Sequence, residues 1–105
     1  MQIKNKNIFL SVFSLGLISA LENDALTPEE CEVLLFNPYM LHILEKTGMD
    51  NTITDIIHKG SELDDINRLV PDAYKPALTE MKDEILLYIK NHDTIEYPIE
   101  RYFDN

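Results

Sequence analysis

The chain has 105 residues, of which 19 are acidic and 9 are basic, so its formal net charge is −10. This length suits a single domain, and the one cysteine excludes an intramolecular disulfide framework and a multi-cysteine zinc site. Hydrophobic residues make up 45% of the chain, as in globular rather than disordered proteins. The acidic balance argues against nucleic acid as a partner, because binding to phosphate depends on Lys and Arg.

Residues 8–21 form an apolar run, IFLSVFSLGLISAL, that follows two lysines. The run is shorter than the about 20 residues of a membrane-spanning helix, so no membrane span is expected. On a helix its serines lie within one arc: Ser11, Ser14 and Ser19. That pattern favours a first helix inside a bundle. The alternative is a cleaved signal peptide over residues 1–20, which would make the protein exported rather than cytoplasmic.

Capping residues mark the beginnings of the next two helices. Thr27 and Glu30 flank a proline in a capping box, which predicts a helix that stops by residue 36. Asn37 and Pro38 repeat the cap-plus-proline pattern and predict a second helix through residue 44. Gly48 is expected to end that helix in the left-handed conformation.

Three further helices are expected in the second half of the chain. Asp50 is placed to cap a short helix, which Gly60 is expected to terminate. Ser61 then begins another helix that Pro71 closes. The longest helix is predicted over residues 73–91, where apolar side chains recur every three or four residues.

These patterns predict an all-α protein with a single compact bundle of five or six helices over residues 1–92. Residues 93–105 lack a helical period and are expected to form an irregular C-terminal tail that is acidic and aromatic. No run of paired strands and no internal repeat is found in the sequence. The short connections predict that helices adjacent in sequence pack as neighbours.

No grouping of residues points to catalysis, and no cofactor is expected. The sequence has no phosphate-binding loop, no dinucleotide-binding motif and no nucleophile elbow. Cys31 is the one thiol, and the flanking Glu30 and Glu32 disfavour a thiolate, so we interpret it as a structural cysteine. The alternative from another class is a small metal-binding protein or enzyme centred on His58, Glu62 and Asp65.

The second half of the chain combines acidic and aromatic residues. Such surfaces suit a basic protein partner, because charge raises the encounter rate and rings supply contacts that exclude water. The candidate partner-binding residues are Asp83, Glu84, Glu96, Tyr97, Glu100, Tyr102 and Phe103. We therefore expect a non-enzymatic protein-interaction module, with a homodimer as a further possibility because the first helix is so apolar. One version of this hypothesis is a small immunity or antitoxin-like protein.

Four motifs resemble a family of small bacterial proteins that is classed only as a domain of unknown function. They are Leu15-Gly16-Leu17, Thr27-Pro28-Glu29-Glu30, Leu34-Leu35-Phe36 with Pro38-Tyr39, and Ile56-Ile57-His58 with Gly60, Glu62-Leu63 and Asp65. The resemblance covers about residues 8–75 and leaves the tail outside it. It implies a small cytoplasmic bacterial protein and supplies no activity.

Overall fold

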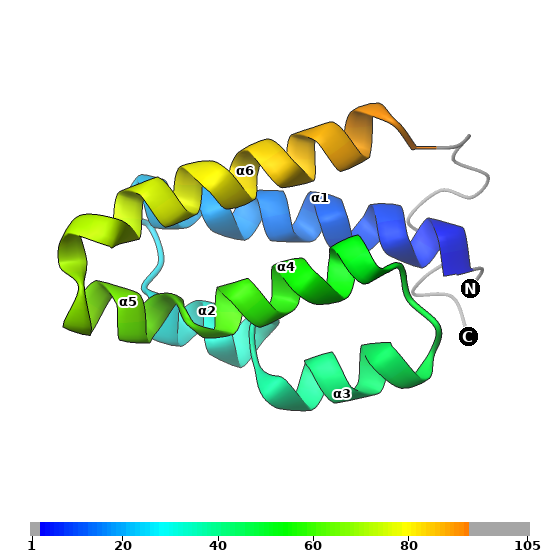
Figure 1. Cartoon of the computed structure of the whole chain (residues 1–105), viewed down its shortest axis with the longest axis horizontal. Helices are drawn as coiled ribbons and strands as arrows, with labels where there is room; N and C mark the ends of the chain where they lie inside the picture. Colours follow the sequence, from blue (N-terminus) through cyan, green and yellow to red (C-terminus); the bar gives the residue numbers. More distant parts are fainter. Residues whose placement is uncertain (1–2, 93–105) are drawn as a thin grey trace.

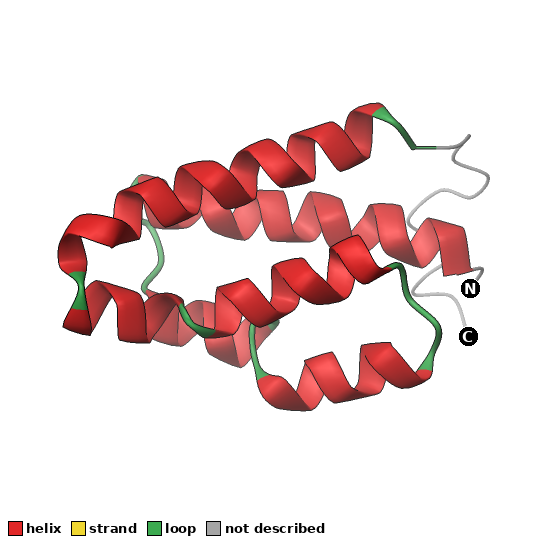
Figure 2. Ribbon diagram, viewed as in Figure 1, coloured by secondary structure: helices red, strands yellow, loops and turns green. Residues whose placement is uncertain are grey.

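The computed structural model of the chain describes residues 3–92, and all regular structure in that range is helical (Figures 1 and 2). The all-α prediction is therefore confirmed for these residues. The segments in chain order are α1 (Ile3–Glu22), α2 (Pro28–Leu34), α3 (Pro38–Lys46), α4 (Asn51–Ser61), α5 (Leu63–Leu69), the 3-10 turn η1 (Pro71–Ala73) and α6 (Tyr74–Lys90).

The predicted number of five or six helices is slightly off. Four of the helices, α1, α3, α4 and α6, have nine or more residues. The other two, α2 and α5, have seven residues each and act as short links between the long helices. The bundle is therefore built on four main helices.

The first and last helices of the described chain lie side by side. α1 and α6 run antiparallel along the length of the molecule and make the most extensive contact between any two elements (Figure 1). α4 packs against both of them, and α3 folds back along α4. Helices adjacent in sequence do pack as neighbours from α3 to α6, as predicted, and the most extensive contact joins the two ends of the described chain.

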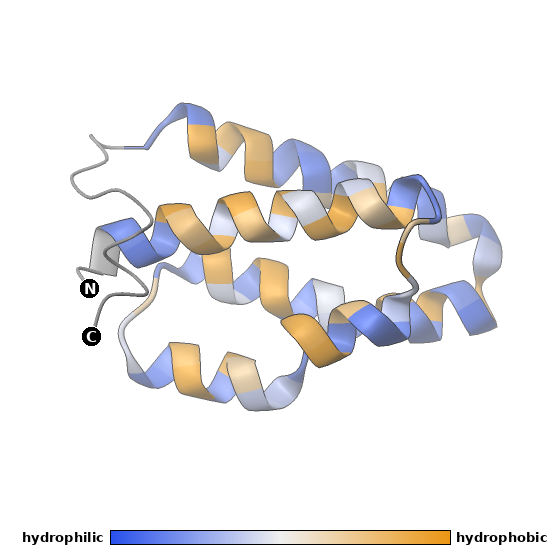
Figure 3. Ribbon diagram, turned by 180° about the vertical axis from the view of Figure 1, so that it is seen from behind, coloured by the Kyte–Doolittle hydropathy of each residue, from blue (hydrophilic) through white to orange (hydrophobic). Residues whose placement is uncertain are grey.

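The core is formed by the apolar stripes that the helical periods predict. On α4 the side chains of Ile53, Ile56 and Ile57 are buried, as their i, i+3 and i+4 spacing requires. α6 buries a matching stripe, Leu78, Met81 and Ile85. In Figure 3 most of α1 beyond its first turn is coloured hydrophobic or neutral, which agrees with its position along the bundle. No described helix is both long and apolar enough to cross a membrane.

α1 turns part of its serine stripe toward the core. Ser11 and Ser14 are 0% and 1% exposed, whereas Ser19 is exposed and Val12 is 54% exposed. The Ser11 hydroxyl donates a hydrogen bond of 2.7 Å to the carbonyl of Ile8, so its burial leaves no donor unused. Small side chains on the inner face let α1 approach its neighbours closely, and size decides the orientation here more than polarity does.

The predicted caps of α2 and α3 are confirmed. The Thr27 amide donates to the Glu30 carboxylate at 2.9 Å, and the Thr27 hydroxyl accepts from the Glu30 amide at 3.2 Å. The Asn37 side chain accepts from the Met40 amide at 2.8 Å. Gly48 has a φ of +74°, the left-handed conformation expected after α3.

The predicted boundary between α4 and α5 is wrong. Gly60 does not end a helix but lies buried within α4, which continues to Ser61. The physical reason is the aromatic ring of Phe36, which packs directly on the bare Cα of Gly60: a Cβ atom there would lie 2.3 Å from Phe36 Cγ. Ser61 does not cap α5 either, since its hydroxyl donates to the carbonyl of His58. Asp50 precedes α4 without a side-chain cap and instead accepts a hydrogen bond of 3.0 Å from the Tyr88 hydroxyl.

Candidate functional site

A hollow of about 180 Å³ lies where α4 and α5 meet α6. Its floor is apolar and its rim is charged, and we call it the α5–α6 hollow. The floor residues are Leu63, Ile66, Ala77 and Met81, and the rim residues are Lys59, Glu62 and Glu80. Ligand pockets are usually apolar with a few polar groups, and this hollow is smaller but has the same composition.

The hollow lies beside the junction at which α5 follows α4 after a single residue. Glu62 separates the two helices, and the buried Leu63 anchors the first turn of α5 against the core. α6 then presents Ala77 and Met81 at i and i+4, on one side of the helix. Ala77, whose side chain is a single methyl group, lines the hollow beside Met81.

The charged rim has an excess of carboxylates. The ammonium of Lys59 lies 2.9 Å from Glu84 Oε1, 3.4 Å from Asp55 Oδ2 and 4.0 Å from Glu80 Oε1. The hydrogen bond that Lys59 donates to Glu84 raises the pKa of Lys59, while burial opposes this and the nearby carboxylates of Glu84 and Asp55 add to it. One positive charge therefore serves three negative ones, and the cluster keeps a net negative charge.

A second acidic group lies between α2 and α5. The pKa of Glu32 is raised, first by burial and then by the neighbouring charges of Asp64, Asp65 and Glu29. Among the described side chains, only Arg68 forms an ion pair with this group, through Asp65. The acidic surface thus continues from the rim of the hollow around α5 to α2.

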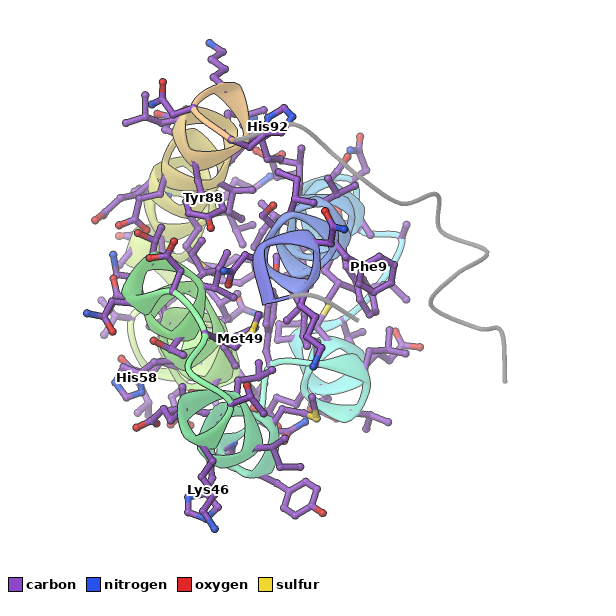
Figure 4. The ribbon with its side chains drawn as sticks, turned by 90° about the vertical axis from the view of Figure 1, so that its right-hand side faces the viewer. Phe9, Lys46, Met49, His58, Tyr88 and His92 are labelled. Carbon is purple, nitrogen blue, oxygen red and sulfur yellow. The ribbon has the colours of Figure 1, made fainter. Side chains whose placement is uncertain are left out.

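The three residues of the metal-site hypothesis are only partly brought together. His58 Nε2 and Glu62 Oε1 are 2.9 Å apart on the exposed side of the α4–α5 junction, but Asp65 pairs with Arg68 instead. Figure 4 shows His58 on the outer side of α4, far from His92 at the end of α6. Within residues 3–92 no three His, Cys, Asp or Glu side chains are placed to hold a metal ion together.

The predicted partner-binding residues divide between the described and undescribed parts of the chain. Asp83 is exposed on α6, and Glu84 is half-buried, where it binds Lys59 with both carboxylate oxygens at 2.9 and 3.2 Å. Glu84 therefore joins α6 to α4 within the bundle. The remaining candidates lie outside the described residues: Glu96, Tyr97, Glu100, Tyr102 and Phe103.

Cys31 is a buried structural residue, 1% exposed and without a disulfide partner. Burial, followed by the nearby charge of Glu30, raises its pKa to about 11. The pKa of Tyr74 is also raised, first by burial and then by Cys31. Because both groups keep their protons at neutral pH, neither is prepared to act as a nucleophile or a base.

Sequence reasoning did not identify Lys59, Ala77 or Glu80 as site residues. Lys59 and Glu84 are 25 positions apart, so their ion pair carries no local pattern. The only sequence signal for two of these residues is the spacing of Ala77 and Glu80, which are three positions apart and therefore lie near one another on a helix. The hollow itself depends on how α5 is placed against α6.

A comparison with family profiles links the chain to other proteins. The profile of the family described as "Protein of unknown function (DUF3969)" matches residues 2–104. The chain belongs to that family. The match confirms membership of a family classed as a domain of unknown function, and it extends the resemblance from residues 8–75 into the C-terminal tail. The comparison with curated proteins finds no match, and neither does the comparison with solved structures.

Proposed function

We propose that this chain is a non-enzymatic protein-interaction module that binds a basic protein partner through its acidic face. We define the acidic face as six carboxylate residues of the α4–α6 segment. Glu62 and Glu80 line the α5–α6 hollow, and the other four lie on the same helices: Asp55, Asp64, Asp65 and Glu84. The observation that carries the proposal is the cluster around Lys59, in which three carboxylates share one ammonium.

Uncompensated negative charge beside an apolar cavity favours association with a cationic surface. The charge steers a basic partner and raises its association rate, and this effect weakens as salt screens the field. The floor of the hollow, with Leu63 and Met81, supplies apolar surface that a partner can cover. Together these features support binding more directly than they support catalysis.

The two buried neighbours Cys31 and Tyr74 do not form an acid–base site. An acid–base site needs a group whose pKa lies near neutral pH, next to a second group in a shared pocket. Cys31 and Tyr74 are neighbours, but burial moves the pKa of each away from neutrality. A more specific form of the same proposal is a cytoplasmic immunity or antitoxin-like role, in which the acidic face covers a basic toxin. The small size and net negative charge of the chain support it.

The test uses tetralysine as a cationic probe and tetraglutamate as its anionic counterpart, each titrated into the ¹⁵N-labelled full chain. We expect tetralysine, but not tetraglutamate, to shift amide resonances along α4–α6, with an affinity that falls as salt rises. The variant Glu62→Gln with Glu80→Gln should weaken tetralysine binding at least threefold. The control, Asp24→Asn with Glu45→Gln, removes the same charge elsewhere and should have a smaller effect.

Two results would overturn the proposal. Tetralysine could fail to bind at low salt, or the two charge variants could weaken binding equally, which would show that only the overall net charge matters. Sedimentation of the free chain measures its oligomeric state. A homodimer whose interface covers α4–α6 would also overturn the proposal, because the acidic face would then be out of reach of any partner.

A further inference from the structure

We infer that the α5–α6 hollow receives one lysine side chain of the basic partner, with its methylenes on the apolar floor and its ammonium between Glu62 and Glu80. This inference rests on the proposed function and names the contact at its centre. The argument uses the volume of the hollow, the chemistry of its floor and the pairing of its two rim carboxylates.

The size of the hollow matches one long, thin side chain. Its volume of about 180 Å³ leaves room for one long side chain. A lysine side chain has five non-hydrogen atoms, four of them in a flexible hydrocarbon stem. It is long enough to cover the floor beside Ala77 and Met81, whereas a short residue such as aspartate would leave that floor in contact with water.

The apolar floor of the hollow suits the methylene stem of a lysine, and the carboxylates at its rim suit the ammonium at the end of that stem. The inner surface consists of Leu63, Ile66, Ala77 and Met81, which offers no polar side chain to an entering group. Carboxylates occur only at the rim, so a cation is favoured at the mouth and hydrocarbon is favoured below it. An uncharged apolar side chain would satisfy the floor alone, and a short cation would satisfy the rim alone.

Both rim carboxylates retain capacity for another cation. Glu80 is 74% exposed and lies 4.0 Å from Lys59, whose ammonium is closer to Glu84 and Asp55. Glu62 pairs with His58, which carries a positive charge only when it is protonated. An incoming ammonium would therefore improve the pairing of both Glu62 and Glu80.

The chain already contains an example of this contact. Lys59 lines the hollow, and its ammonium reaches carboxylates on two helices while the side chain stays 34% exposed. Glu62 and Glu80 likewise approach the mouth of the hollow from different elements. A compact ammonium can bind carboxylates from two directions, whereas the planar guanidinium of arginine is best matched by one carboxylate in its own plane.

The experiment compares three blocked tripeptides, Gly-X-Gly, in which X is lysine, ornithine or norleucine, by titration into the ¹⁵N- and ¹³C-methyl-labelled full chain. Lysine should bind most tightly. Ornithine, which lacks one methylene, should bind up to about fourfold more weakly. Norleucine, which keeps the stem but lacks the charge, should bind at least tenfold more weakly. Nuclear Overhauser contacts are expected between the lysine methylenes and the methyl groups of Ile66, Ala77 and Met81.

A filled hollow provides the variant test. Ala77→Leu should reduce lysine tripeptide binding at least fivefold, and Ala25→Leu, at an exposed position away from the hollow, should leave it unchanged. Circular dichroism and the unfolding midpoint check that both variants are folded. If Ala77→Leu fails to fold, the contacts between the peptide methylenes and the wild-type methyl groups decide the question without it.

Several outcomes would overturn the inference, and they differ from those that overturn the proposed function. If tetralysine binds the acidic face but the tripeptide methylenes show no contact with the floor, the interaction module stands and the lysine pocket does not. Equal affinity for lysine and norleucine would assign the hollow to an apolar side chain. Contacts from the chain itself to the floor residues before peptide is added would mean that the hollow is already occupied.

Discussion

Gly60→Ala is expected to destabilise the fold although alanine is the better helix former. The added Cβ atom would lie 2.3 Å from Cγ and 2.6 Å from each Cδ atom of Phe36. Those atoms form the base of a ring that is fully buried, so the ring cannot swing away. Overpacking of this kind costs about 3 kcal/mol, and the helix propensity of alanine returns about 1 kcal/mol. The net loss is therefore about 2 kcal/mol.

Gly16→Ala is the matched control, because Gly16 also lies inside a helix but its added Cβ atom would meet nothing within 4 Å. This change should stabilise the protein by about 0.5–1 kcal/mol. Urea unfolding followed by far-ultraviolet circular dichroism measures both variants. The reasoning is refuted if Gly60→Ala matches or exceeds the wild-type stability. Phe36→Ala, which removes the Cγ and Cδ atoms of the clash, should cost less in the Gly60→Ala background than in the wild type.

Three further changes are predicted. Burial raises the pKa of Cys31 from 9.0 to about 11, so the unfolded chain releases this proton at a lower pH than the folded chain does. The free energy of unfolding should therefore be unaffected by this group below pH 9 and should fall by an amount of order 2 kcal/mol as pH rises toward 11. Cys31→Ala should reduce this fall when urea unfolding is compared at pH 8 and pH 11. Lys59→Met should lower the free energy of unfolding by about 0.5–1 kcal/mol at pH 7, more than the control Lys75→Met does. Folding raises the pKa of Lys59 above 10.5, so its ion pairs are lost as pH rises above that value, and the difference between the two variants should then vanish. Asn37→Ala should lower the free energy of unfolding by about 1–2 kcal/mol, because the side chain caps α3 and also donates to the carbonyl of Glu32 at 2.7 Å. An unchanged midpoint in thermal or urea unfolding would contradict that role.

The helix boundaries that could be predicted are those set by local chemistry. Thr27 and Asn37 cap helices through hydrogen bonds to residues three positions away, so both partners lie within the same short stretch of sequence. Gly48 likewise needs only its own freedom to adopt a positive φ. Such features are recoverable from the sequence because no distant part of the fold takes part in them.

Gly60 shows why other features could not be predicted. A glycine after an apolar helical stretch can end the helix or can make room for a neighbour, and the sequence pattern is the same in both cases. Here Phe36, which is 24 positions earlier, decides between them. The ion pair of Lys59 with Glu84 and the α5–α6 hollow depend in the same way on helix packing, so no local pattern contains them.

The pairing of α1 with α6 has a consequence for synthesis of the protein. Roughly fifty residues separate Glu22 from Tyr74, and ribosomes add about 5–20 residues per second. α1 therefore spends several seconds outside or within the ribosomal tunnel before its main packing partner has been made. During that interval the part of its inner face that α6 covers in the finished fold is open to chaperones and non-native contacts, so the nascent chain is more exposed to aggregation before translation reaches the last helix.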